Sequence, residues 1–142
     1  MSGERPSEAS MNNAVVHCLT LYYGTQYENS VASFVRYRPT DPFFVSVDIP
    51  GHSLQIDMTR STLSAGLNAP TESGHVLVGP SEDREWTIIR IRIPDGNELL
   101  FCTSRALVGE FLAETYQAVP MGQENEQINW DIAHSFFLHE SE

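Results

Sequence analysis

The residues best suited to chemistry are two cysteines, Cys18 and Cys102, and five histidines. A cysteine beside a histidine can act as a nucleophile activated by a general base. His17 and Cys18 are neighbours in an alternating apolar segment, where adjacent side chains point to opposite faces, so they cannot form such a pair. Cys102 and His75 remain a possible pair, although a buried thiol that packs as a small hydrophobe is the commoner role.

The histidines do not form a metal-binding pattern. His52 and His75 follow glycines in expected turns, and His134 and His139 do not have the H-x-x-x-H spacing of helical metal ligands. The serine hydrolase, P-loop and dinucleotide motifs are absent from the sequence. We therefore expect no catalytic residue, no metal and no cofactor, and a protein that is not an enzyme.

Two pairs of charged residues stay open as candidates. Asp48 and Asp57 flank the turn at Pro50-Gly51 and could face each other as a general-acid pair, although solvated acids beside a turn are more common. Arg90 and Arg92 share one face of an expected strand and could bind an anion or an acidic partner segment. The alternative is that both arginines lie on the wet face of a half-covered sheet.

Length and charge narrow the class of protein. A chain of 142 residues supports one hydrophobic core. Its net charge of -11 repels nucleic acid and anionic membranes at long range. Residues 1–13 have no apolar stretch, and no run approaches the roughly 18 apolar residues that a membrane helix needs. We expect a cytoplasmic protein without membrane insertion, and leave open whether Cys18 and Cys102 lie near each other.

The first half of the chain predicts strands followed by a helix. Residues 1–13 offer little to bury and predict a disordered leader before a single domain at 14–140. Thr59 is positioned to cap a short helix at 60–67. Apolar runs, in part alternating, that end in Gly and Pro turns predict four strands, at 14–23, 30–38, 43–49 and 54–58.

The second half repeats that order. Expected strands lie at 76–78, 86–93 and 99–103. Thr103 or Ser104 caps a helix that ends before Pro120. Asn129 is positioned to cap a final helix at 130–138. Strands and helices in this order predict an α+β fold.

Several short motifs are more specific in their combined order and spacing than any one of them alone. Over roughly residues 15–139 this order resembles the SsgA-like family of sporulation and cell division proteins. The motifs are Asp41-Pro42-Phe43-Phe44-Val45, Leu63 to Leu67 with Pro70-Thr71, Gly74-His75-Val76 with Val78 and Pro80, Thr103 to Leu107 with Phe111-Leu112, and Val119-Pro120 with Gly122 and Glu124.

The resemblance implies a fold and a function. The fold would be whirly-like, with two antiparallel β-sheets and packed α-helices in the order strands-helix-strands-helix-helix. The function would be that of a non-enzymatic regulator of cell division and sporulation-type septation. As an adaptor at the division septum, it would position or recruit the tubulin-like protein FtsZ or another septal protein. We expect a homo-oligomer, a trimer or tetramer, because several copies multiply weak contacts. The partner-binding residues are unknown at this stage.

Two other hypotheses come from different classes of protein. A whirly-like single-stranded nucleic-acid-binding protein would use aromatic side chains on strands, but the acidic balance opposes it. A small hydrolase built on Cys102 or His75 would need a concave pocket with a base within about 3 Å of the nucleophile.

Overall fold

The computed structural model describes residues 14–127. The first half is an antiparallel meander in which each strand pairs with the next. Its strands are β1 (Val15–Tyr23), β2 (Asn29–Tyr37), β3 (Phe44–Ile49) and β4 (Leu54–Thr59), with the 3-10 helix η1 (Pro50–His52) before β4. The helix α2 (Arg60–Gly66) follows β4, and the Thr59 side chain accepts from Thr62 N at 3.1 Å, which confirms the predicted cap.

The second half repeats the arrangement of four strands followed by a helix. Its elements are β5 (Thr71–Ser73), β6 (Val76–Pro80), β7 (Trp86–Arg92), β8 (Glu98–Ser104), α3 (Arg105–Ala118) and the 3-10 helix η2 (Glu124–Gln127). Ser104 caps α3 by accepting from Leu107 N at 3.2 Å. Sequence analysis missed β5, a strand of three residues. The expected leader at 1–13 and the expected helix at 130–138 lie outside the described residues.

The expected α+β, whirly-like fold with two sheets is wrong. The strands form one antiparallel sheet in the order β4-β3-β2-β1-β8-β7-β6-β5, and the described residues contain only two α-helices. The two meanders join because β1 pairs with β8 at Tyr22 and Cys102, and Thr103 Oγ1 donates to Thr20 O at 2.9 Å. A pairing between strands about eighty residues apart leaves no local pattern in the sequence.

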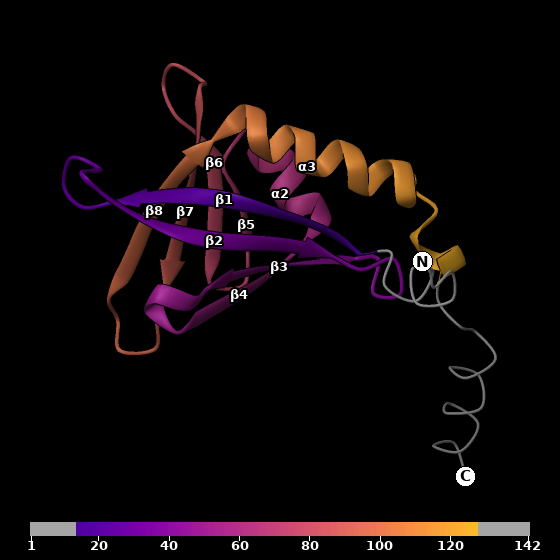
Figure 1. Ribbon diagram of the computed structural model, residues 1–142, viewed down its shortest axis with the longest axis horizontal. Coiled ribbons are helices and arrows are strands. Elements are labelled where there is room, and N and C mark those ends of the chain that lie inside the picture. Colours follow the sequence, from indigo (N-terminus) through magenta and orange to yellow (C-terminus); the bar gives the residue numbers. More distant parts are fainter. Residues whose placement is uncertain (1–13, 128–142) are drawn as a thin grey trace, which may run out of the picture.

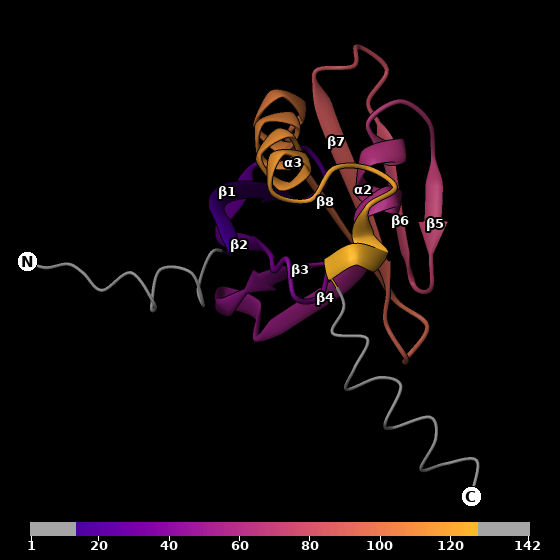
Figure 2. The same ribbon diagram turned by 90° about the vertical axis from the view of Figure 1, so that its right-hand side faces the viewer.

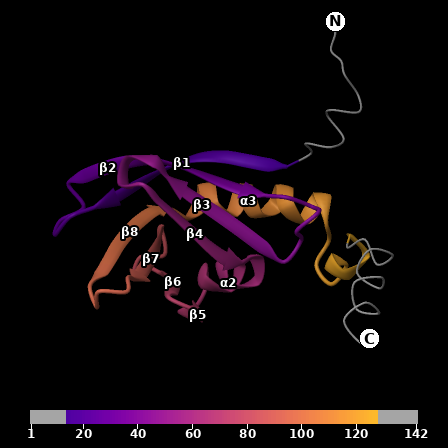
Figure 3. The ribbon, with the colours of Figure 1, turned by 90° about the horizontal axis from the view of Figure 1, so that it is seen from below.

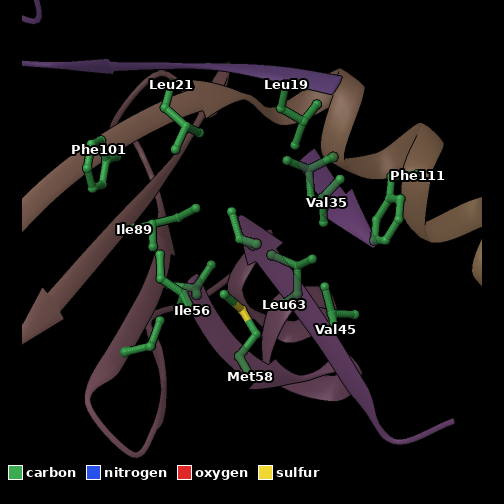
Figure 4. Packing of buried hydrophobic residues seen from close by; sticks show 14 of the residues in the cluster. Leu19, Leu21, Val35, Val45, Ile56, Met58, Leu63, Ile89, Phe101 and Phe111 are labelled. Carbon is green, nitrogen blue, oxygen red and sulfur yellow. The ribbon is translucent and has the colours of Figure 1, made fainter. Parts of the chain in front are cut away.

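The sheet curves until it nearly closes on itself, and both helices pack against its inner side (Figures 1, 2 and 3). Helix α2 contacts β4, β5 and β6, so it bridges the two edges of the sheet. Helix α3 contacts β1, β7 and β8. Alternate residues of every long strand point inward, where Leu21, Val35, Ile89 and Phe101 share one hydrophobic core with Phe111 of α3 (Figure 4).

A buried arginine ties the helices together. Arg60, 1% exposed, stacks against the rings of Tyr37 at 4.8 Å and Tyr116 at 4.0 Å. Its Nη1 donates to Thr115 O at 3.0 Å and to Val119 O at 2.8 Å, the carbonyls at the end of α3. Its Nη2 donates to Glu124 Oε2 at 2.8 Å. One guanidinium therefore caps α3 from α2 and holds the segment that follows it.

Replacing Arg60 tests this role. Arg60→Met keeps an unbranched side chain but removes the buried donor to Thr115 O and Val119 O and the ion pair with Glu124, which should cost about 2–3 kcal/mol of unfolding free energy. Arg38→Met is the control, because Arg38 is exposed and should change stability by less than about 0.5 kcal/mol. Urea unfolding of both variants measures the difference. Equal losses in the two variants would contradict the role of Arg60.

The ion pair predicts a pH dependence. The hydrogen bond from Arg60 lowers the pKa of Glu124 below its ordinary value of 4.5. The stabilisation is therefore complete above the pKa of the unfolded chain and is lost as pH falls through the lower pKa of the folded chain. Glu124→Gln should cost about 1 kcal/mol at neutral pH and nothing in strong acid. Unfolding curves across this range test it against Glu126→Gln, an exposed acid of η2 that should show no such trend.

Candidate partner-binding surface

The structure does not bring Cys102 and His75 into one site. Cys102 lies on β8, opposite Ile88 of β7. His75 lies in the β5–β6 turn and lines a different hollow of about 180 Å³, beside Arg90 and Arg92. No hydrogen bond between Cys102 and His75 is present in the described structure. The geometry therefore gives no support to a nucleophile and base built on this pair.

His17 and Cys18 lie on opposite faces, as predicted. His17 Nε2 is 3.0 Å from Glu114 Oε2, and its ring packs edge-on against Phe111 at 5.4 Å, both on α3. Cys18 is exposed on the outer face, opposite Phe34. It is four residues along β1 from Tyr22, the partner of Cys102, which separates the two cysteines by roughly 13 Å. Both thiols are free, and that separation is too large for a disulfide.

Of the four charged candidates, Asp57 and Arg90 have side-chain partners in the structure. The register places Gln55 opposite Asp48 and Ser46 opposite Asp57, so the two aspartates are not directly opposed. Asp57 Oδ1 accepts from Ser46 Oγ at 3.0 Å and from Gln55 Nε2 at 3.2 Å. Arg90 and Arg92 share the outer face of β7 as predicted, and Arg90 Nε lies 3.8 Å from Glu98 Oε1.

Residues 14–127 contain no group of three or more His, Cys, Asp or Glu side chains arranged to hold a metal ion. They also contain no helix that is long and apolar enough to cross a membrane.

The most distinctive surface feature is an apolar hollow on the outer face where the two halves of the sheet join. It has a volume of about 440 Å³. The pairs Tyr22–Cys102 and Ile88–Cys102 place its floor across β1, β8 and β7. The rings of Tyr22 and Trp86 pack edge to face at 5.8 Å. Its lining consists of Tyr22, Tyr27, Ser81, Trp86, Ile88 and Cys102.

Two turns build the walls of this hollow. The β1–β2 turn holds Tyr27 at a φ of 55°, and Tyr27 N donates to Gly24 O at 3.1 Å. In the β6–β7 turn, Trp86 N donates to Ser81 Oγ at 3.1 Å and Ser81 N donates to Trp86 O at 3.0 Å. These bonds fix the backbone on both sides of the hollow, so it is formed before any partner arrives.

The chemistry of the hollow suits recognition of an apolar side chain. Cys102 is buried on its floor, and burial raises the pKa of this thiol, which keeps it protonated and unreactive. Trp86 stays 37% exposed at the rim. Aromatic residues around a small apolar pocket are the usual anchors of protein interfaces. We call the hollow lined by these residues the Trp86 hollow: Tyr22, Tyr27, Ser81, Trp86, Ile88 and Cys102.

The sequence pattern predicts only part of this surface. The expected strand at 86–93 contains Trp86 and Ile88, but no local pattern brings Tyr22 or Tyr27 to them. The missing information is the β1–β8 pairing. A second apolar area, with Val16 46% exposed and Phe34 38% exposed, lies on the outer face of β1 and β2. Neither Val16 nor Phe34 lines the Trp86 hollow.

Comparison with known proteins decides the family. Residues 31–124 match the family model described as Streptomyces sporulation and cell division protein, SsgA. The chain belongs to this family. A sporulation-specific cell division protein SsgB of Frankia casuarinae is 36% identical over 106 residues, covering 71% of this chain and 73% of that protein. SsgB of Streptomyces coelicolor is 31% identical over 137 residues, covering 91% of this chain and 99% of that protein.

Solved structures agree with this membership. A structure of SsgB from Streptomyces coelicolor, reported with mutations that correlate to longitudinal cell division during sporulation, has a TM-score of 0.73 at 29% identity. The match covers 88% of this chain and 99% of that one. An SsgA-like sporulation-specific cell division protein from Thermobifida fusca has a TM-score of 0.72 at 23% identity, and shows the same fold. Membership in this SsgA family supports a role in septation during sporulation.

Thiol labelling tests the geometry of the Trp86 hollow. Cys18 is exposed, whereas Cys102 is buried and its pKa is raised, so iodoacetamide should modify Cys18 at least about tenfold faster. Trp86→Ala should speed the modification of Cys102 and leave Cys18 unchanged. Mass spectrometry of the two peptides measures both rates. Equal rates in the unchanged protein would contradict the placement of Cys102 under the hollow.

Proposed function

We propose that this protein is a non-enzymatic adaptor that positions or recruits FtsZ, or another septal protein, at the division septum during sporulation. The Trp86 hollow is the proposed docking site. The single observation that carries the proposal is this preformed aromatic hollow on the outer face, in a chain that belongs to a family of sporulation and cell division proteins.

The physical separation of the hollow from the core supports a docking role. The core fills the inner side of the curved sheet, and the Trp86 hollow lies on the outer side, so a partner can bind without opening the fold. Trp86 and Tyr22 offer rigid rings that lose little conformational entropy when a partner covers them. A trimer or tetramer, which we also propose, would present several such hollows at once.

Cosedimentation with assembled FtsZ filaments tests the proposal. The full chain should pellet with FtsZ from the same organism, and Trp86→Ser should weaken binding by at least about tenfold, as expected for an aromatic anchor. Phe34→Ser is the matched control. Phe34 lies on the outer face of β2 and is 38% exposed, against 37% for Trp86. It does not line the Trp86 hollow, so binding should persist. Thermal unfolding of both variants confirms that they fold.

Each other outcome points to a specific failure. If the unchanged protein does not pellet with FtsZ, FtsZ is not the partner. If both variants bind equally well, the docking surface lies elsewhere. The net charge of -11 disfavours binding of single-stranded DNA. If the protein nevertheless binds single-stranded DNA at physiological salt, measured beside the pelleting assay, the result contradicts the adaptor role and favours a nucleic-acid-binding protein.

A further inference from the structure

A second hollow adjoins the first and is lined by two arginines. It has a volume of about 410 Å³ and lies where β7 and β8 meet the start of α3. Trp86 lines both hollows, so the two meet at this residue. The lining consists of Arg84, Glu85, Trp86, Ser104, Arg105 and Ala106. The surface therefore combines an apolar cavity with two adjacent guanidinium groups.

Neutral groups hold both arginines in place. Arg84 Nη1 donates to Asn68 O at 3.2 Å. Arg105 Nε donates to Leu67 O at 3.0 Å, and its Nη2 donates to Asn68 Oδ1 at 2.8 Å. Neither arginine forms an ion pair with a carboxylate of residues 14–127. Both charges are thus positioned beside Trp86 and remain available to an external carboxylate.

The β6–β7 turn fixes Arg84 at an unusual backbone angle. Arg84 has a φ of 62°, a left-handed conformation that costs energy for a residue with a side chain. Asp83 Oδ1 supports the turn by accepting from Ser81 Oγ at 2.7 Å and from Glu85 N at 3.0 Å. These bonds lower the pKa of Asp83 and use its carboxylate within the turn.

The charges around the surface limit what it can bind. Glu82, Asp83 and Glu85 lie in the same turn as Arg84. Arg84 and Arg105 can donate hydrogen bonds to one or two carboxylates of a partner whose apolar side chain occupies the Trp86 hollow. A nucleic acid carries a charge on every phosphate, so its backbone would run past the acids as well as the arginines. The observations favour a peptide over a nucleic acid.

We propose that this composite surface recognises a short peptide segment of the partner in which a bulky apolar side chain is followed or preceded by carboxylates. The apolar side chain enters the Trp86 hollow, and a neighbouring carboxylate pairs with Arg84 and Arg105. The inference rests on the proposed docking role of the Trp86 hollow. It adds the chemical class of the segment that docks there.

A peptide titration tests the inference. The probe is a short synthetic peptide in which an Asp-Asp pair adjoins a Phe-Leu pair, and the readout is the nuclear magnetic resonance signal of the Trp86 indole N–H in the full chain, assigned by its loss in Trp86→Ser. Replacing Asp-Asp by Asn-Asn should weaken binding roughly tenfold, because two exposed ion pairs are lost. Replacing Phe-Leu by Ser-Ser should abolish the shift.

Variants that remove the positive charge of these arginines locate the effect. In the double variant Arg84→Gln with Arg105→Gln, the Asp and Asn peptides should bind equally, and added salt should no longer weaken binding of the Asp peptide. The single variant Arg84→Gln keeps the contacts of Arg105 with Leu67 and Asn68 and should show an intermediate loss. Arg36→Gln, on the outer face of β2, should bind like the unchanged protein.

The outcomes separate this inference from the proposed function. Equal binding of the Asp and Asn peptides to the unchanged protein would overturn the inference, as would an oligothymidine that displaces the Asp peptide. If the arginine double variant pellets with FtsZ like the unchanged protein while Trp86→Ser does not, the carboxylate recognition is wrong and the adaptor role stands. If FtsZ never pellets but binding of the Asp peptide depends on Arg84 and Arg105, FtsZ recruitment fails and the inference stands.

Discussion

The fold depends on one narrow junction between two four-stranded meanders. Strands β1 and β8 pair at Tyr22 and Cys102, with one side-chain bond from Thr103 to the carbonyl of Thr20 beside them. A junction of this size cannot by itself fix the angle between the halves, since a few hydrogen bonds contribute only about 1 kcal/mol each. The helices supply the rest: α3 packs on strands of both halves, and α2 bridges the two sheet edges. Arg60 then joins the start of α2 to the end of α3 through hydrogen bonds to buried carbonyls, so the two helices that hold the halves are themselves connected.

Because both helices pack on the inner side of the sheet, its outer face is left free for binding. No helix of the described residues covers the outer row of Tyr22, Cys102 and Ile88. Tyr27 of the β1–β2 turn and Trp86 at the start of β7 complete the lining of the hollow. The hollow is therefore a direct product of the junction. Its apolar floor is stable because Cys102 is a small buried thiol that needs no strong hydrogen-bond partner. The helices and the core stabilise the inner side of the sheet, and the hollow lies on its outer side. This arrangement suits an adaptor, which must keep its shape while other proteins bind to and leave its surface.

Local patterns in the sequence predicted local structure well. Apolar runs, in part alternating, with turn residues between them predicted seven of the eight strands. A hydroxyl side chain just before a helix predicted the cap at Thr59 and narrowed the second cap to Thr103 or Ser104, of which Ser104 is the one in the structure. The number of sheets was wrong because the β1–β8 pairing joins strands that are far apart in the chain. Arg60 escaped notice because a charged residue in the first turn of a helix usually faces water. The Trp86 hollow was missed for the same reason as the junction, since its two aromatic walls come from opposite halves.

The size of the Trp86 hollow argues for binding by several copies at once. Burying one large apolar side chain contributes about 1.5–3 kcal/mol, and each exposed ion pair adds about 0.2–1 kcal/mol. Their sum is close to the roughly 4 kcal/mol that corresponds to a millimolar dissociation constant. One chain would therefore hold one partner segment only briefly. A filament displays the same segment on every subunit, so an oligomer of this chain could engage several segments together and raise the overall affinity by orders of magnitude without any new contact. Such an adaptor distinguishes an assembled filament from free subunits by avidity alone, and this property suits a protein that marks where a septum forms.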